Sequence, residues 1–308
     1  MPVEKLLIAN RGEIAIRIAR AAEELGISSV AIYSTDDHSS LHREMTSESH
    51  ALEGSGVSAY LDIEHIVDAA IATGCDAIHP GYGFLAENAD FADALENAGL
   101  TFVGPSASQL ALFGNKVAAR ELAARLEVPL VPATAGSTSV ADVEAFLKEH
   151  KAIMIKATAG GGGRGMREVR LGDDVAAIFE RCQSEALSAF GVGDVYAERL
   201  IENARHIEVQ IIGDGANIAH VGERECTLQR QNQKIIEIAP SPSIDTSLRA
   251  LLTDAATKMA SEVGYRSLGT WEFLVDADDP STVAFIETNA RLQVEHTVTE
   301  EVTGIDLV

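Results

Sequence analysis

The sequence has 308 residues, 46% of them hydrophobic and 23% charged, which is the composition of an ordinary globular protein of about two domains and excludes a disordered chain. Its net charge of −23 argues against a surface for nucleic acid or anionic membrane. Three cysteines without a CxxC pair, a charged N-terminus unlike a signal peptide, and no apolar run of roughly 20 residues predict a cytoplasmic protein without disulfides or a membrane span.

The first third of the chain alternates short apolar runs with helical patterns. The strand-like runs lie at residues 5–10, 28–34, 76–80 and 100–105, and the helical ones at 13–26, 63–74 and 88–99. This alternation predicts a parallel, doubly wound sheet with helices on both faces, and ligands of such sheets bind at the carboxyl ends of the strands. Residues 10–13 and 79–83 fall at those ends. No GxGxxG follows the first strand, so a dinucleotide fingerprint is absent.

The second region begins near Lys116 with a helical stretch at 116–126, and hairpin signals come later. Residues 206–223 alternate in polarity around Asp214-Gly215, a dipeptide typical of hairpin turns. Residues 268–296 repeat the pattern around a longer loop at 276–281. We therefore expect antiparallel sheet and an α+β build in this region.

A glycine-rich run, AGGGGRG at 159–165, follows the strand-like run IMIKAT. Consecutive glycines leave backbone N–H groups free to wrap an anion, and no Cβ prevents its close approach. Lys156 adds a point charge and Arg164 a planar fork, so we predict phosphate binding, with a flexible hairpin tip as the alternative. No GK[ST] follows, which excludes a Walker A loop.

Polar residues at a spacing of two form the strongest constellation. Glu287 and Asn289 share one face of a predicted strand, and Glu272 lies on the strand before it. Carboxylate and amide oxygens suit Mg²⁺, so we predict a metal site there. The same spacing continues through Arg291, Gln293 and Glu295, which predicts one long strand whose polar face lines a binding site. The residues between them would pack behind this face: Ile286, Thr288, Ala290, Leu292 and Val294. The alternative is a solvated strand face.

Two further polar residues have weaker signals. His206 shares a strand face with Glu208, although a lone histidine is more often structural. Lys234 lies in the polar run QRQNQK, which by itself predicts a loop.

Long motifs in this order resemble the biotin carboxylase domain of biotin-dependent carboxylases. They are ANRGEIA, IHPGYGFLAEN, FGNKVAAR, IKATAGGGGRGM, RECTLQRQNQK and FIETNARLQVEHTVTE, and the resemblance runs from about residue 4 to the last residue. It implies a Rossmann-like N-terminal domain at 1–114, followed by an ATP-grasp domain at 115–308 with a small mobile lid at about 130–200. The family continues into a C-terminal domain, which we expect to be missing from this chain.

The resemblance also implies roles for single residues in binding ATP. Lys116 and Lys156 would contact its phosphates. The loop that closes over the phosphates would contain Gly161, Gly162, Gly163, Arg164 and Gly165. The adenine pocket would be lined by Glu198, Arg199 and Ile201. The residues that approach the nucleotide and bicarbonate would be His206, Gln229, Asn232 and Lys234, with Asn232 standing where most of the family has histidine.

The remaining implied roles concern the metal, bicarbonate and biotin. Mg²⁺ or Mn²⁺ would be held by Glu272, Glu287 and Asn289. Bicarbonate would be bound by Arg291, Gln293 and the backbone of Val294, with Glu295 as the general base. Biotin, covalently carried as a substrate, would lie near Tyr82 and Gly83.

The implied reaction is the ATP-dependent activation of bicarbonate to carboxyphosphate and the carboxylation of biotin on a carrier domain. A carboxyltransferase domain or subunit would then transfer the carboxyl group from biotin to an acyl-CoA, pyruvate or urea acceptor. The full-length protein would be a homodimer or larger assembly. Two alternatives stay open: another ATP-grasp ligase that acts through an acyl phosphate, and a fragment that binds Mg-nucleotide without full turnover.

Overall fold

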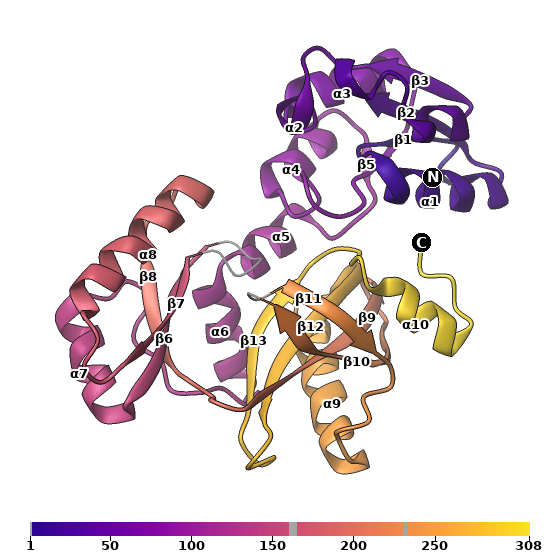
Figure 1. The fold of residues 1–308 in the computed structure, drawn as a ribbon. Helices are drawn as coiled ribbons and strands as arrows, with labels where there is room; N and C mark the ends of the chain where they lie inside the picture. The colour runs from indigo at the N-terminus through magenta and orange to yellow at the C-terminus, as the bar shows by residue number, and fades with distance from the viewer. Residues whose placement is uncertain (1, 160–164, 231–232) are drawn as a thin grey trace.

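The structure is a computed structural model that describes residues 2–159, 165–230 and 233–308. Its three sheets have the strand orders β3-β2-β1-β4-β5, β7-β6-β8 and β11-β10-β9-β12-β13. Figure 1 shows the first sheet at the top, the small second sheet at the left and the third at the lower right. Within the described ranges, no helix is both long and apolar enough to cross a membrane.

The first sheet is parallel throughout, as the alternating pattern predicts. Its strands are β1 (Lys5–Ile8), β2 (Ser28–Tyr33), β3 (Glu48–Ala51), β4 (Ala77–His79) and β5 (Thr101–Phe102). Its helices are α1 (Gly12–Glu24), α2 (Gly56–Ala59), α3 (Ile63–Ala72) and α4 (Ala89–Asn97), with 3₁₀ turns at Thr35–Asp37 and Leu41–Met45. The strand order reverses between β1 and β4, which places residues 10–13 and 79–83 at one crevice.

Asn10 closes this crevice. Its side-chain amide donates to the carbonyl oxygens of Pro80 and Tyr82, at 2.7 and 2.8 Å. Gly81 has a φ of +65°, and a Cβ there would lie 3.0 Å from the Asn10 amide nitrogen, so the turn requires glycine.

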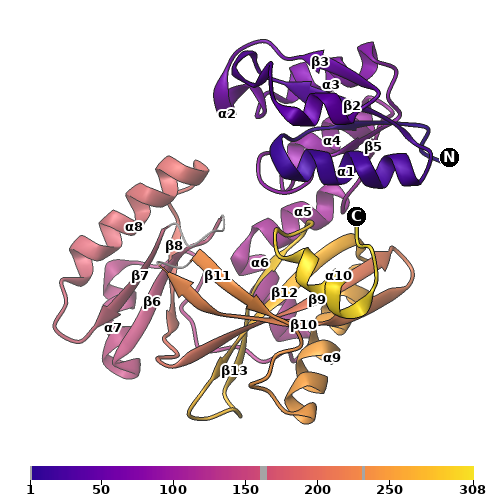
Figure 2. The same ribbon diagram turned by 45° about the vertical axis from the view of Figure 1, so that its right-hand side comes forward.

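Two helices, α5 (Ala107–Gly114) and α6 (Lys116–Arg125), lead from the parallel sheet into the rest of the chain. The small antiparallel sheet follows, with β6 (Ala152–Ala157) between β7 (Met166–Arg170) and β8 (Val195–Arg199). Helices α7 (Val140–His150) and α8 (Val175–Phe190) pack on it through a core that includes Val143, Ile153 and Phe179. Figure 2 shows this unit extending to one side of the larger sheet.

The third sheet is antiparallel and carries most of the polar motifs. It contains β9 (Ala204–Asp214), β10 (Ile218–Arg230), β11 (Gln233–Ile238), β12 (Arg266–Asp276) and β13 (Val283–Asn289), with α9 (Thr246–Glu262) and α10 (His296–Thr303) beside it. Its apolar face buries Val209, Trp271 and Phe273. Trp271 stacks edge-on against Phe113 of α5, with the ring centroids 5.5 Å apart, so one core joins this sheet to the helices that precede it.

Both predicted hairpins are present, but two local predictions are wrong. The strand predicted to run to residue 295 ends at Asn289; the chain then turns, and Glu295 precedes α10. Val294 accordingly lies exposed and is not packed behind the strand. Lys234 belongs to strand β11 and not to a loop, because β11 pairs with β10.

Candidate functional site

A cavity of about 830 Å³ opens between the small sheet and the polar face of the large sheet. Its lining takes residues from β6, β8, β9, β11, β12 and β13 and from the turn before α10. The predicted site residues in the lining are Lys116, Lys156, Glu198, Arg199, Ile201, His206, Gln229, Lys234, Glu272, Glu287, Asn289, Arg291, Gln293, Val294 and Glu295. Residues more than 170 positions apart in the sequence thus meet at one place.

Eight predicted site residues are not in the cavity lining: five lie outside the described ranges, and three are described but lie elsewhere. Gly161, Gly162, Gly163, Arg164 and Asn232 lie outside the described residues. Gly165 is described and has a φ of +65°; its carbonyl accepts a hydrogen bond from Ala157 N at 3.0 Å, which turns the chain into β7. Tyr82 and Gly83 do not line the cavity: Tyr82 packs against the core of the parallel sheet, and Gly83 is exposed.

Three carboxylates form a row across neighbouring strands of the large sheet, and two of them, Glu272 and Glu287, line the cavity. Glu272 on β12 is the cross-strand partner of both Glu208 on β9 and Glu287 on β13. Residues directly opposite in neighbouring strands point to the same face, so the register alone brings the three together. Like charges at this spacing repel one another, and such a row requires cations beside it.

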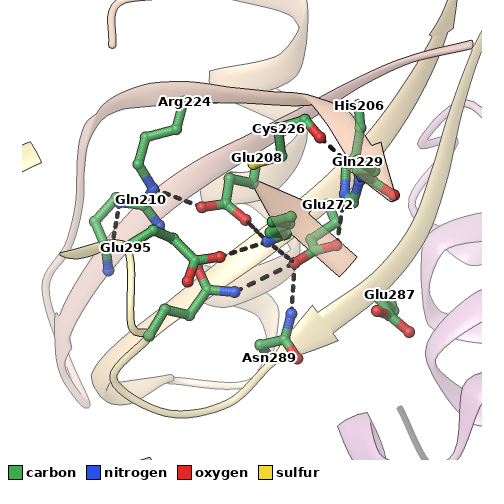
Figure 3. A network of polar contacts seen from close by, with 12 residues as sticks. His206, Glu208, Gln210, Arg224, Cys226, Gln229, Glu272, Glu287, Asn289 and Glu295 are labelled. Carbon is green, nitrogen blue, oxygen red and sulfur yellow. Dashed lines mark hydrogen bonds and ion pairs between the residues drawn. The ribbon is translucent and has the colours of Figure 1, made fainter. Parts of the chain in front are cut away.

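Lys234 and His206 supply those cations. Lys234 Nζ bonds Glu208, lies 3.1 Å from Glu272 Oε1 and lies 2.6 Å from Glu295 Oε1. His206 Nε2 lies 2.6 Å from Glu272 Oε2. Burial favours the neutral acid, but the charges of His206 and Lys234 outweigh it and hold the pKa of Glu272 well below its usual value. Figure 3 shows the carboxylates of Glu208, Glu272 and Glu295 pointing toward one another, with His206 beside Glu272.

Glu295 is a carboxylate at neutral pH for the same reason. Burial raises its pKa, whereas Lys234 and then Arg224 lower it, and the net direction is downward. Beside it, Arg291 donates from Nη2 to Asn289 Oδ1 at 3.2 Å and from Nε to Glu87 Oε2 at 2.8 Å. The turn before α10 therefore sets a carboxylate and a guanidinium at one end of the cavity.

Glu272, Glu287 and Asn289 fit a divalent cation by the chemistry of their donors. Two carboxylates and one amide, all on adjacent strands, offer the hard oxygens that Mg²⁺ prefers. Asn289 Nδ2 donates to Glu272 Oε1 at 2.6 Å, which leaves its oxygen directed away from that carboxylate. Glu287 is paired with Lys116, whose pKa burial lowers but the Glu287 carboxylate raises more.

The opposite end of the cavity combines a buried ion cluster with an apolar slot. Glu198 bonds Lys156 and accepts from Arg120 Nη1 at 2.6 Å and from the Tyr196 hydroxyl at 3.1 Å. Burial raises the pKa of Glu198, but Lys156 and Arg120 lower it more, so Glu198 is a carboxylate. The apolar lining there consists of Val131, Met154, Leu200, Ile201, Leu274 and Ile286. Lys156 beside this apolar slot suits a ligand that combines an anionic group with an apolar part.

Sequence patterns missed several residues of this site. Arg224 on β10 is fully buried and donates to Glu208 Oε1 at 2.5 Å, and no pattern in the sequence singled it out. Glu237 on β11 lies on the cavity wall, and among the described residues neither of its buried carboxyl oxygens has a hydrogen-bond partner. Burial raises the pKa of Glu237 to about 7.

Two family models match the chain. The model for the N-terminal domain of biotin carboxylase matches residues 2–110, and the model for the ATP-binding domain of the carbamoyl-phosphate synthase L chain matches residues 115–308. Among curated relatives, pyruvate carboxylase of Aspergillus niger is 48% identical over 315 residues, which cover 100% of this chain and 26% of that protein. The chain therefore spans about a quarter of the length of that relative.

Solved structures resemble the chain over its whole length. The biotin carboxylase of Campylobacter jejuni, in a β,γ-ATP complex, is 41% identical with a TM-score of 0.96, and the match covers 99% of this chain and 69% of that one. The biotin carboxylase domain dimer of Hydrogenobacter thermophilus 2-oxoglutarate carboxylase, with MgADP, ADP and bicarbonate, is 44% identical with a TM-score of 0.95 over 100% of this chain and 68% of that one.

Proposed function

We propose, since this chain belongs to the biotin carboxylase family of ATP-dependent ligases, that it carries out the biotin carboxylase half-reaction. In that reaction bicarbonate is activated by Mg-ATP to carboxyphosphate, and biotin on a carrier domain is then carboxylated. One observation carries the proposal for this chain: Glu295, Arg291 and Gln293 line the same cavity as the carboxylates Glu272 and Glu287 and the lysines Lys116 and Lys156.

Glu295 would act as the general base. An ionised carboxylate can take the proton of bicarbonate, and the oxygen that loses this proton attacks the γ-phosphorus of ATP. Arg291, Gln293 and the backbone of Val294 would hold the bicarbonate in place for that attack. Lys234, 2.6 Å from Glu295 Oε1, keeps the base ionised and would interact with the carboxyphosphate that forms.

Lys116 and Lys156 would bind the phosphates of ATP, and His206 and Gln229 would approach the nucleotide. The adenine ring of ATP would lie in the apolar slot, beside Glu198, Arg199 and Ile201. The loop of Gly161, Gly162, Gly163, Arg164 and Gly165 would cover the phosphates and exclude water as part of a lid at about 130–200. Mg²⁺ or Mn²⁺, held by Glu272, Glu287 and Asn289, would supply positive charge to the phosphate oxygens.

Biotin and the partner domains complete the proposal. Tyr82 and Gly83, outside the cavity lining, would meet biotin at its rim. The H. thermophilus domain is a dimer with MgADP and bicarbonate, and this supports the same ligands and a homodimer for the present protein. A biotin carrier and a carboxyltransferase, on the same chain or on others, would be the partners. The three free, buried cysteines support the expected cytoplasmic location.

The test is ATP hydrolysis by the protein as its gene encodes it, with and without bicarbonate and free biotin. We expect hydrolysis to require bicarbonate and to increase with biotin. Hydrolysis that ignores both would favour another ATP-grasp ligase. Binding of MgADP without any hydrolysis would favour the alternative of a nucleotide-binding module without turnover.

A further inference from the structure

Arg224 contacts a proposed bicarbonate ligand from behind the cavity, where no substrate reaches it. Its side chain on β10 is fully buried, and it is absent from the cavity lining. We propose that Arg224 is a positioning residue for the anion site: it fixes the side-chain amide of Gln293 so that the amide presents N–H, and not oxygen, to bicarbonate. The inference rests on the proposed function, which assigns bicarbonate to Gln293.

The amide of Gln293 is held from two sides. Arg224 Nη2 donates to Gln293 Oε1 at 2.7 Å, and Gln293 Nε2 donates to Glu272 Oε1 at 3.2 Å. A guanidinium has only donors and a carboxylate only acceptors. If the amide were rotated by 180°, its N–H groups would face the guanidinium and its oxygen the carboxylate, so both contacts would be repulsive. The two neighbours therefore permit one orientation.

This orientation suits an anion. Gln293 Nε2 carries two hydrogens, and Glu272 is the one acceptor recorded for them within the described part of the chain. Gln293 lines the cavity, so the second hydrogen can be directed to an oxygen of bicarbonate. With the amide reversed, an oxygen would face the anion and repel it.

The remaining contacts of Arg224 hold the guanidinium itself in place. Nε donates to Glu208 Oε1 at 2.5 Å, and Nη1 donates to Gln210 Oε1 at 3.0 Å and to Thr299 Oγ1 at 2.7 Å. These acceptors come from β9 and α10, and Gln293 comes from the turn between β13 and α10. Arg224 thus ties that turn to the sheet in a fixed plane, which a lysine cannot do because its ammonium is a single point.

The experiment compares Arg224→Lys with the unsubstituted protein as its gene encodes it. We expect the KM for bicarbonate in ATP hydrolysis to rise about tenfold, as for the loss of one hydrogen bond to a charged group. The KM for ATP should change less than about twofold, because no proposed nucleotide contact is removed. Arg249→Lys is the matched control: Arg249 also pairs with a buried carboxylate, donating to Glu223 Oε1 at 2.8 Å, but it does not line the cavity.

A double-mutant cycle separates positioning from general support of the fold. If Arg224 acts through Gln293, then Arg224→Lys should have little further effect on the bicarbonate KM once Gln293→Ala is present. Effects of the two substitutions that simply add would overturn the proposal. So would a bicarbonate KM in Arg224→Lys that equals that of the unsubstituted protein.

Gln293→Glu provides a second variant in case Arg224→Lys does not fold. Its carboxylate still accepts from Arg224, but it offers oxygen in place of N–H to the anion. The bicarbonate KM should rise by about tenfold or more, and an unchanged value would contradict the inference. Hydrolysis by the unsubstituted protein that ignores bicarbonate would instead overturn the proposed function, and the anion role of Gln293 with it.

Discussion

The parallel sheet and the large antiparallel sheet place their polar residues in opposite ways. In the parallel sheet, the central strand β1 is apolar on both faces, as in Leu7 and Ile8, and the polar residues Asn10 and Arg11 lie in the loop after it. In the antiparallel sheet, charged residues stand within the strands themselves, as in Glu208 and Glu272, over an apolar face that includes Trp271. Apolar strand residues such as Leu7 and Ile8 need no counter-ions, whereas the buried carboxylates of the antiparallel sheet are stable only because cations lie beside them.

The comparison predicts that the chemistry depends on the antiparallel sheet and on the turn between β13 and α10, and that the loops of the parallel sheet only adjust it. Glu295→Gln should therefore have the largest effect. It should lower bicarbonate-dependent ATP hydrolysis by about 10²–10⁴-fold, because the amide cannot take the proton. The dissociation constant of MgADP, measured by isothermal titration calorimetry, should stay close to that of the unsubstituted protein. A large loss of MgADP affinity would contradict the role of Glu295 as base.

The two regions should also differ in their response to acid. Burial lowers the pKa of His79, at the end of β4, to about 4, and its Nδ1 accepts a hydrogen bond from Gly81 N at 3.0 Å, as the neutral ring does. The unfolded chain binds this proton below about pH 6.5 and the folded chain only below about pH 4. The fold should therefore lose stability as the pH falls from about 6.5 to 4, by up to about 3 kcal/mol.

Urea unfolding at a series of pH values tests this, with His79→Gln beside the unsubstituted protein. The variant should show a shallower loss of stability between about pH 6.5 and 4, since glutamine does not titrate. His38→Gln, at an exposed histidine of the same region, should keep the full pH dependence. Identical curves for His79→Gln and the unsubstituted protein would show that His79 does not contribute. In the antiparallel sheet, Glu272 and Glu295 should lose their stabilising effect only at lower pH, because their neighbours hold the pKa of both carboxylates below the usual value. Glu237 should act in the opposite direction to His79, because burial raises its pKa to about 7 and the fold then gains stability as the pH falls from about 7 to 4.5.

Lys156→Ala tests the proposed contact between the small sheet and the phosphates of ATP. It should weaken ATP binding by about 10–100-fold, because it removes a charged contact to phosphate. The loss also leaves Glu198 with Arg120 as its remaining cation within the described residues, so the thermal unfolding temperature should be measured beside the affinity. Lys148→Ala, at an exposed lysine on α7, is the matched control. Unchanged ATP binding in Lys156→Ala would return the glycine run to the alternative of a flexible hairpin tip.

The same contrast explains what could be predicted from the sequence. The parallel sheet and both hairpins follow from local patterns, since apolar runs and turn residues are properties of short segments. Arg224 could not be predicted, because its acceptors Gln293 and Thr299 lie 69 and 75 residues away. The end of β13 at Asn289 was missed because the polar spacing of two continues after the chain has left the strand. Lys234 was predicted in a loop because the run QRQNQK is polar throughout. It lies in a strand because β11 pairs with β10, which the local sequence does not reveal.

Glu87 tests whether the parallel sheet reaches the site at all. It follows β4 in the chain and accepts from Arg291 Nε at 2.8 Å, which links a loop of the first region to a proposed bicarbonate ligand. Glu87→Gln keeps an oxygen acceptor but removes the charge, and the pair is partly exposed, so we expect the smallest effect: a rise in the bicarbonate KM of about two- to fivefold at unchanged ATP KM. Because solvent screens the pair, the effect should shrink further at high salt. An effect as large as that of Glu295→Gln would mean that the loop takes part in the chemistry. The prediction that the loops of the parallel sheet only adjust it would then be wrong.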